Sequence, residues 1–133
     1  MSEARSRRRL GGEPPSPYEG KFGFSRTLAF GDYVIVGGTT SIDEDGVVVG
    51  ETPYDQAVEI LGKVTHELGR VGAAIDDVVQ MRIYVTDISR GEEVGRAHGE
   101  VFGAHPPVMT MVEVSALIDP RMLVEMEAVA YVG

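Results

Sequence analysis

Two carboxylates near the C-terminal end of the chain, Glu125 and Glu127, have the residue type and the spacing for proton chemistry. They occur in the run VEMEAVA, and side chains two residues apart share one face of a strand. A carboxylate that is held within hydrogen-bond reach of a water molecule can act as its general acid or base. Glu125 is therefore the candidate catalytic residue. The alternative is that it forms a structural ion pair on the sheet.

The strand that positions Glu125 is predicted by alternation within residues 108–132. On one side of its run, the side chains are all apolar: Val124, Met126, Ala128 and Ala130. A second alternating run, residues 108–114, precedes it and ends near a turn at Asp119 and Pro120. We expect Glu113, Glu125 and Glu127 to share the other face, which then meets water, a cation or another subunit.

The rest of the chain predicts three further strands and two helices. Strand-like runs cover residues 25–30, 33–39 and 78–86, and the first two form a tight hairpin around Gly31 and Asp32. One helix begins after Thr52 with Pro53 and ends near Gly72. The second begins at a capping-box pattern, Ser89 with Glu92, and ends at Gly103. The predicted order is β-β-α-β-α-β-β.

This order predicts an α+β fold in which one mixed sheet carries two helices on one face. Val79, Met81, Ile83 and Val85 are expected to point toward the helices. Two helices cannot cover both faces, so the opposite face, with Arg82 and Tyr84 beside the glutamates, is expected to remain open. We expect Arg82 to pair with one of the glutamates, and this face to contact sister subunits in a closed oligomer.

Length and charge predict one folded domain at residues 18–133, preceded by a flexible arm at residues 1–17. The formal net charge of the 133 residues is −9, although four arginines lie within the first ten residues. Residues 14–133 contain 8 basic and 19 acidic residues, so this body carries about −11. Because such a body repels phosphate groups, nucleic-acid binding is not expected as its main activity. The basic tail is read as a solvated end, with contact to an anionic partner as the alternative.

Other classes of site lack the residues that they require. The chain has no cysteine, so disulfides, thiol nucleophiles and thiolate metal sites are excluded. His66, His98 and His105 do not have the spacing of helical zinc ligands, and no phosphate loop or dinucleotide fingerprint is present. We therefore expect no metal and no cofactor. No apolar run has the length of a signal peptide or a membrane span, which predicts a soluble cytoplasmic protein.

The closing run VEMEAVA, the glycine pair Gly37 and Gly38, the segment GAAIDDVVQMRIYVTDI and a helix ending in VF occur in one order. Together they resemble the Rid family, the reactive intermediate deaminases also called YjgF. The resemblance implies a chorismate-mutase-like homotrimer with clefts between its subunits. It also implies hydrolysis of imines or enamines, derived from amino acids, to ketones and ammonia.

The resemblance extends unevenly to the family's functional positions. Tyr18, the backbone of Gly38 and Glu125 match, whereas Met109 occupies the position of the arginine that binds the substrate carboxylate in deaminating members. Three other family positions also differ: Gly37 replaces a serine, Met111 a cysteine and Gly95 an asparagine. Arg26 is a possible replacement cation, with an ordinary surface role as the alternative. The expected substrate-binding set is Tyr18, Arg26, Gly37, Gly38, Met109 and Met111.

Two functions remain open at this point. The first is a Rid-like hydrolase that acts on a small imine or enamine, with the two methionines making the cleft more apolar. The second is a trimer that binds a metabolite, or regulates, without turnover, which the missing arginine favours. Nuclease activity is disfavoured by the acidic body.

Overall fold

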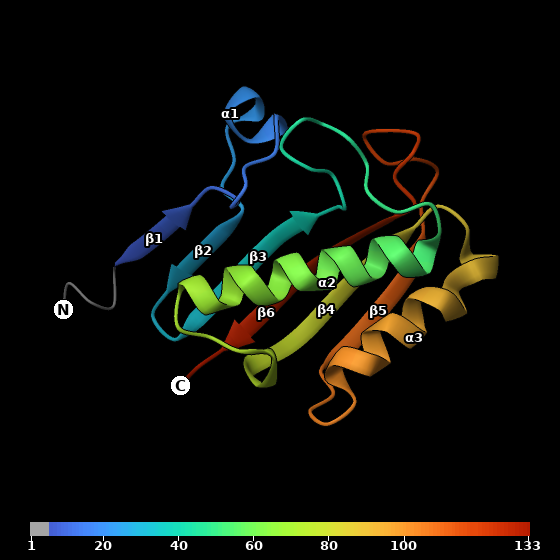
Figure 1. Cartoon of the computed structure of the whole chain (residues 1–133). Helices are drawn as coiled ribbons and strands as arrows, with labels where there is room; N and C mark the ends of the chain where they lie inside the picture. The colour runs from blue at the N-terminus through green and yellow to red at the C-terminus, as the bar shows by residue number, and fades with distance from the viewer. Residues whose placement is uncertain (1–5) are drawn as a thin grey trace.

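A computed structural model describes residues 6–133, which form one six-stranded sheet with two long helices on one face (Figure 1). The strand order is β1-β2-β3-β6-β4-β5, and all neighbours are antiparallel except the parallel pair β4 and β5. The strands are β1 (Arg7–Leu10), β2 (Thr27–Phe30), β3 (Tyr33–Thr39), β4 (Val78–Val85), β5 (Val108–Glu113) and β6 (Val124–Tyr131). The α+β prediction with a mixed sheet is confirmed.

The two long helices, α2 (Pro53–Arg70) and α3 (Gly91–Phe102), pack on the sheet because each carries one apolar stripe. Helix α2 begins as predicted: the Thr52 hydroxyl accepts a hydrogen bond from the Asp55 backbone N–H at 3.1 Å, and Pro53 occupies the first turn. The stripes of the two helices bury Ala57, Ile60, Leu61, Val64, Leu68, Val94, Ala97 and Phe102, each at most 2% exposed. These side chains form the core with the inner face of the sheet.

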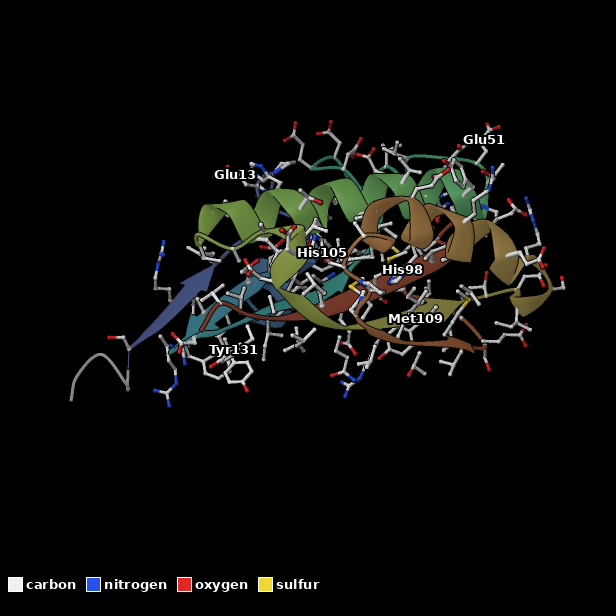
Figure 2. All side chains as sticks on the ribbon, turned by 90° about the horizontal axis from the view of Figure 1, so that it is seen from below. Glu13, Glu51, His98, His105, Met109 and Tyr131 are labelled. Carbon is white, nitrogen blue, oxygen red and sulfur yellow. The ribbon has the colours of Figure 1, made fainter. Side chains whose placement is uncertain are left out.

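Strand β6 lies between β3 and β4 in the middle of the sheet. Its inner face is the predicted apolar one: Val124, Met126, Ala128 and Ala130 are 0–1% exposed. Seen along the sheet, both long helices lie on one side and Tyr131 lies on the other (Figure 2). Glu125 and Glu127 therefore point away from the helices, as the alternation predicts.

The N-terminal arm is more ordered than predicted, because residues 7–10 form strand β1 against β2. Without β1, strand β2 would be an edge with unpaired backbone groups, and β1 pairs with these groups as the second antiparallel neighbour of β2. Beyond it, the Arg70 guanidinium donates to the Gly11 carbonyl at 2.6 Å, and a short helix, α1 (Tyr18–Phe22), follows. Residues 7–10 of the expected flexible arm are therefore part of the sheet, and residues 1–5 of it lie outside the described part of the chain.

Two local predictions are corrected by the backbone. Val79 does not point inward: the β4–β6 register shifts between Val78 and Gln80, so Val78 is buried and Val79 is 44% exposed. The helix start at Ser89 is also wrong, because helix α3 begins at Gly91. The Asp87 carboxylate instead accepts from the Ser89 N–H at 3.0 Å and caps the preceding 3₁₀ turn, η3 (Ile88–Arg90).

The parallel register of β4 and β5 corrects the placement of Glu113. Glu113 pairs with Val85, whose side chain is buried under the helices, so it lies on the helix side of the sheet rather than on the open face. Its carboxylate accepts a hydrogen bond from the Ile88 N–H at 3.0 Å. On the open face, the expected ion pair forms between Arg82 and Glu127, with a distance of 3.7 Å. None of the helices within residues 6–133 combines the length and the apolar character needed to cross a membrane.

Candidate functional site

A pocket of about 220 Å³ opens where helix α1, the end of β3 and the start of β6 meet. Its walls come from three segments far apart in sequence, residues 16–26, 38–42 and 118–125, which the fold brings together at one end of the sheet. The lining residues are Ser16, Tyr18, Phe22, Phe24, Arg26, Gly38, Thr40, Ile42, Ile118, Met122 and Glu125. Concave sites of this kind, with apolar walls and a few polar groups, are the usual places for small ligands.

Glu125 is the only acid among the residues that line the pocket. It is half-buried, and this burial raises the pKa of its carboxyl; the charge of Glu127 raises it further, whereas Arg26 lowers it. A carboxyl whose pKa moves from its ordinary value toward neutrality is better matched to proton transfer. The position of Glu125 therefore suits a general acid or base.

Gly38 makes room for this carboxyl. The β3–β6 register shifts between Val36 and Thr39, so Gly38 lies in the irregular part of the pairing, and the carboxyl of Glu125 lies against it. A Cβ atom at Gly38 would overlap the Glu125 Oε2 atom and lie 3.2 Å from its Cδ atom. The position thus requires glycine for close approach rather than for an unusual backbone conformation.

A buried ion pair, Arg26 with Glu19, lies behind the pocket. The Arg26 Nη2 and Glu19 Oε2 atoms are 3.1 Å apart, and the side chains are only 5% and 7% exposed. The Glu19 carboxylate also accepts from the N–H groups of Gly12, at 2.7 Å, and Ser16, at 2.8 Å. Arg26 Nε is buried without a hydrogen-bond partner. The pair therefore fixes the segment that carries Ser16 and Tyr18 against β2.

Lys63 of helix α2 supports the opposite wall. Its ammonium group donates hydrogen bonds to the carbonyl of Thr40, at 2.7 Å, and to that of Ile42. Burial, followed by the nearby charge of Arg26, lowers the pKa of Lys63 to about 8. Because both carbonyls belong to residues that line the pocket, the hydrogen bonds of Lys63 hold this part of the lining in position against helix α2.

The mouth of the pocket is apolar, which the sequence analysis missed. Phe22, Phe24 and Ile118 are 55%, 45% and 56% exposed. The ring of Tyr18 stacks on that of Phe22, with centroids 5.7 Å apart. The run FGF next to the glycine-rich arm was the available signal, because aromatic side chains in such a segment are rarely all needed for a core.

The structure brings four predicted site residues into this pocket: Tyr18, Arg26, Gly38 and Glu125. Gly37 lies beside it, and its N–H donates to the Arg26 carbonyl at 2.8 Å. Met109 and Met111 do not line it. They pair with Met81 and Ile83, so they lie on the helix side of the edge strand β5. Within one chain, the two methionines and Glu125 therefore occupy opposite faces of the sheet.

The histidines lie apart from the pocket. His98 is buried, its ring packs at a tilt of 38° on that of Phe102 with centroids 4.6 Å apart, and burial lowers the pKa of its ring. His66 contacts Glu13 at 3.0 Å. Within residues 6–133, no group of three or more His, Asp or Glu side chains is arranged to hold a metal ion.

Comparison with known proteins shows that this chain has a known fold. The family model described as Endoribonuclease L-PSP matches residues 18–132. The chain belongs to this family. A crystal structure from Mycobacterium tuberculosis, described as a member of the YjgF/YER057c/UK114 family, has 44% sequence identity and a TM-score of 0.86. The superposition covers 96% of this chain and all of that one, which confirms the resemblance to the Rid (YjgF) family.

Two further relatives support this placement of the chain. An uncharacterized protein of Streptomyces coelicolor is 38% identical over 118 residues, which cover 89% of this chain and 88% of that one. A structure of the Rid protein family from Yersinia pestis is 24% identical, with a TM-score of 0.84 over 96% of this chain and 100% of that chain. Because its sequence identity is only 24%, the Yersinia pestis structure is evidence for the fold alone.

Proposed function

We propose that the protein is a small-molecule hydrolase that deaminates imines or enamines, with Glu125 as its catalytic carboxyl. The observation that carries the proposal is the half-buried Glu125 in a pocket, with its pKa raised by burial. Membership of the L-PSP family, and the match of Glu125 to the Rid closing motif, support the same residue. A cytoplasmic location, without a resident cofactor, is part of this proposal.

The proposed reaction needs only water and an imine. Glu125 accepts a proton from water as the oxygen attacks the imine carbon, and passes it to the nitrogen, which gives a carbinolamine. Glu125 then takes the proton of the carbinolamine hydroxyl and returns it to the departing nitrogen. The carbon–nitrogen bond breaks, so that the products are a carbonyl compound and ammonia. Tyr18 holds the ligand from the α1 side, and backbone groups near Gly38 stabilise the developing polar atom. Arg26 contributes its charge from behind the wall, because Glu19 already engages its guanidinium group.

We also propose that the protein is a homotrimer whose subunits share the functional clefts. The open face of the sheet carries Tyr33, Ile35 and Tyr131, which are 36–45% exposed, and the two tyrosine rings lie 5.1 Å apart. A soluble chain rarely leaves such a face uncovered. In the trimer, Met109 and Met111 of one subunit would reach the cleft of the next, which the single chain does not allow.

Light scattering tests the trimer. The expected mass is about 43 kDa, three times the 14.3 kDa of one chain. Ile35→Glu on the open face should dissociate the trimer, whereas Val58→Glu, at an exposed position on α2, should leave it intact. A mass of about 14 kDa for the wild type would contradict the proposal.

The alternative of ligand binding without turnover is favoured by one observation, the apolar Met109 where deaminating relatives carry arginine. Ribonuclease activity, which the family name Endoribonuclease L-PSP suggests, has less support. Arg26 is the only cation among the residues that line the pocket, and Glu19 neutralises it. A phosphate chain would thus meet few free positive charges there.

The deciding experiment is ammonia release above the spontaneous rate, from freshly generated imines with and without a carboxylate. The wild type should accelerate hydrolysis of at least one imine, and Glu125→Ala should abolish the acceleration. Glu44→Ala, which removes an exposed acid outside the pocket, is the matched control. Met109→Arg tests the cleft in addition: a gain with 2-iminobutanoate would support a shared site. If no imine is accelerated by the wild type, the alternative of a binding protein is supported.

A further inference from the structure

The wall that faces Glu125 is more apolar than the binding of a small polar imine requires. Phe22, Phe24 and Ile118 are about half exposed at the mouth, and Ile42 and Met122 are buried deeper in the same lining. Single exposed apolar side chains are normal on a protein surface, but a group of them around one pocket indicates an apolar partner.

The part of this wall that carries Phe22 and Phe24 is held in place by hydrogen bonds and by ring stacking. The Glu19 carbonyl accepts hydrogen bonds from the N–H groups of Gly23, at 2.9 Å, and Phe24, at 3.1 Å. Gly23 has a φ of 74°, which ends helix α1 and directs the chain toward Phe24. The Tyr18 ring supports Phe22 by stacking. A preorganised apolar wall loses little conformational entropy when a ligand binds.

Three cations near the pocket are engaged by this chain's own groups, whereas a fourth, Lys21, lies outside the lining with its ammonium nitrogen 5.7 Å from the ring centroid of Phe22. Arg26 is paired with Glu19, and its Nε atom is sealed from solvent. Arg121, which follows the mouth residue Ile118, donates to both oxygens of Asp119, at 3.0 and 2.7 Å. Lys63 donates to the carbonyls of Thr40 and Ile42.

A ligand carboxylate would therefore enter this pocket at a cost. It would lose its water, find no free cation among the lining residues, and lie near the carboxyl of Glu125. An anion buried without a partner is strongly disfavoured, and a like charge nearby adds to the penalty. An apolar group in the same position would gain by leaving water.

We propose that the pocket selects imines or enamines with two features: they carry a large apolar or aromatic group, and they lack a carboxylate beside the reacting carbon. This proposal rests on the hydrolase function proposed above. Phe24 and Phe22 are the specificity-determining residues, and Ile118 closes the other side of the mouth. The products would be aryl or long-chain aldehydes and ketones rather than 2-oxo acids.

Binding of stable carbonyl products tests the selectivity without any need for turnover. Phenylacetone and phenylpyruvate differ only by a methyl group in place of the carboxylate, and butanone lacks the ring. By titration calorimetry, phenylacetone should bind at least about tenfold more tightly than butanone, because it buries one aromatic ring more. It should also bind at least about tenfold more tightly than phenylpyruvate, because it brings no unpaired carboxylate into the pocket. Equal or tighter binding of phenylpyruvate, equal binding of butanone, or no binding of phenylacetone would overturn the proposal.

Variants link the preference to the aromatic wall. Phe24→Ala should reduce the preference for phenylacetone over butanone by about tenfold, and because Phe24 is 45% exposed, the variant should stay folded. Val47→Ala, at an exposed apolar residue outside the lining, should leave the preference unchanged. A preference that survives in both Phe24→Ala and Phe22→Ala would contradict the assignment.

The selectivity and the hydrolase function can fail separately. If phenylacetone is preferred but no imine is hydrolysed, the hydrolase proposal is wrong and the ligand class stands. If 2-iminobutanoate is hydrolysed efficiently and phenylpyruvate binds more tightly than phenylacetone, the hydrolase function stands and the ligand class is wrong.

Discussion

The two faces of strand β6 differ in what their side chains do. On the inner face, Val124, Met126, Ala128 and Ala130 are completely buried under the helices. On the outer face, Glu125 and Glu127 are half-buried, and the pKa of Glu125 is raised. One strand of eight residues thus supplies the centre of the core and the centre of the candidate site.

Alternate residues of the rigid strand β6 therefore serve two purposes, the stability of the core and the chemistry of the candidate site. Because β6 is hydrogen-bonded on both sides, by β3 and β4, its backbone moves little and holds Glu125 at a fixed height above the sheet. Substitutions on the inner face should therefore alter the free energy of unfolding, and those on the outer face should alter turnover. The following predictions test this separation.

The largest effect is expected on the inner face. Met126→Ala removes a fully buried side chain from the middle of the core and should lower the free energy of unfolding by about 2–5 kcal/mol, measured by urea denaturation. Val129→Ala, on the half-buried outer face, should cost less than about 1 kcal/mol. Equal losses for the two variants would remove the distinction between the faces.

The next effect concerns the fit between β3 and β6. Gly38→Ala places a Cβ atom against the Glu125 carboxyl, which must then move, whereas the Gly38 backbone itself can accept alanine. A displacement of about 1 Å can cost about a hundredfold in kcat/KM, and unfolding should change little. Gly20→Ala is the control, since nothing lies within 4 Å of its added Cβ atom. Undiminished turnover of Gly38→Ala would separate Gly38 from the site.

The smallest effect concerns the neighbour on the same face. The charge of Glu127 raises the pKa of Glu125, so Glu127→Gln should lower that pKa. If ionised Glu125 accepts the proton from water, kcat/KM rises with pH through this pKa, and in the variant the rise should move to lower pH. A shift to higher pH would show that Glu127 acts in another way.

Most of the fold was predictable because periodicity decides which side chains are buried. The alternation in β6 and the spacing in α2 give the burial pattern correctly, and the Thr52–Pro53 helix start is where the sequence places it. Three features depend on pairing between distant segments: strand β1, the bulge at Val79 and the face of Glu113. No local pattern specifies the register of a parallel pair or the partner of an edge strand.

The candidate site was predictable where one residue type suffices for the chemistry. Glu125 and Gly38 were predicted correctly, because neither a carboxylate in an apolar strand nor a glycine at a strand end is explained by the strand pattern alone. The apolar mouth of Phe22, Phe24 and Ile118 was missed, since two segments far apart in sequence create it only after folding. Met109 and Met111 were placed with Glu125 by family resemblance, and within one chain the sheet separates them.

Comparison of wild type with Glu125→Gln, in imine hydrolysis and in urea unfolding, tests the central claim most directly. We predict a loss of at least about a hundredfold in kcat/KM. The folded-state pKa of Glu125 is raised above its ordinary value of 4.5, so the folded protein binds this proton more tightly than the unfolded chain does. The stability of the wild type relative to the variant should thus fall as the pH rises from 4.5 through the folded-state pKa, so that at neutral pH the variant is at least as stable. Full turnover by Glu125→Gln, or a marked loss of its stability at neutral pH, would contradict the account.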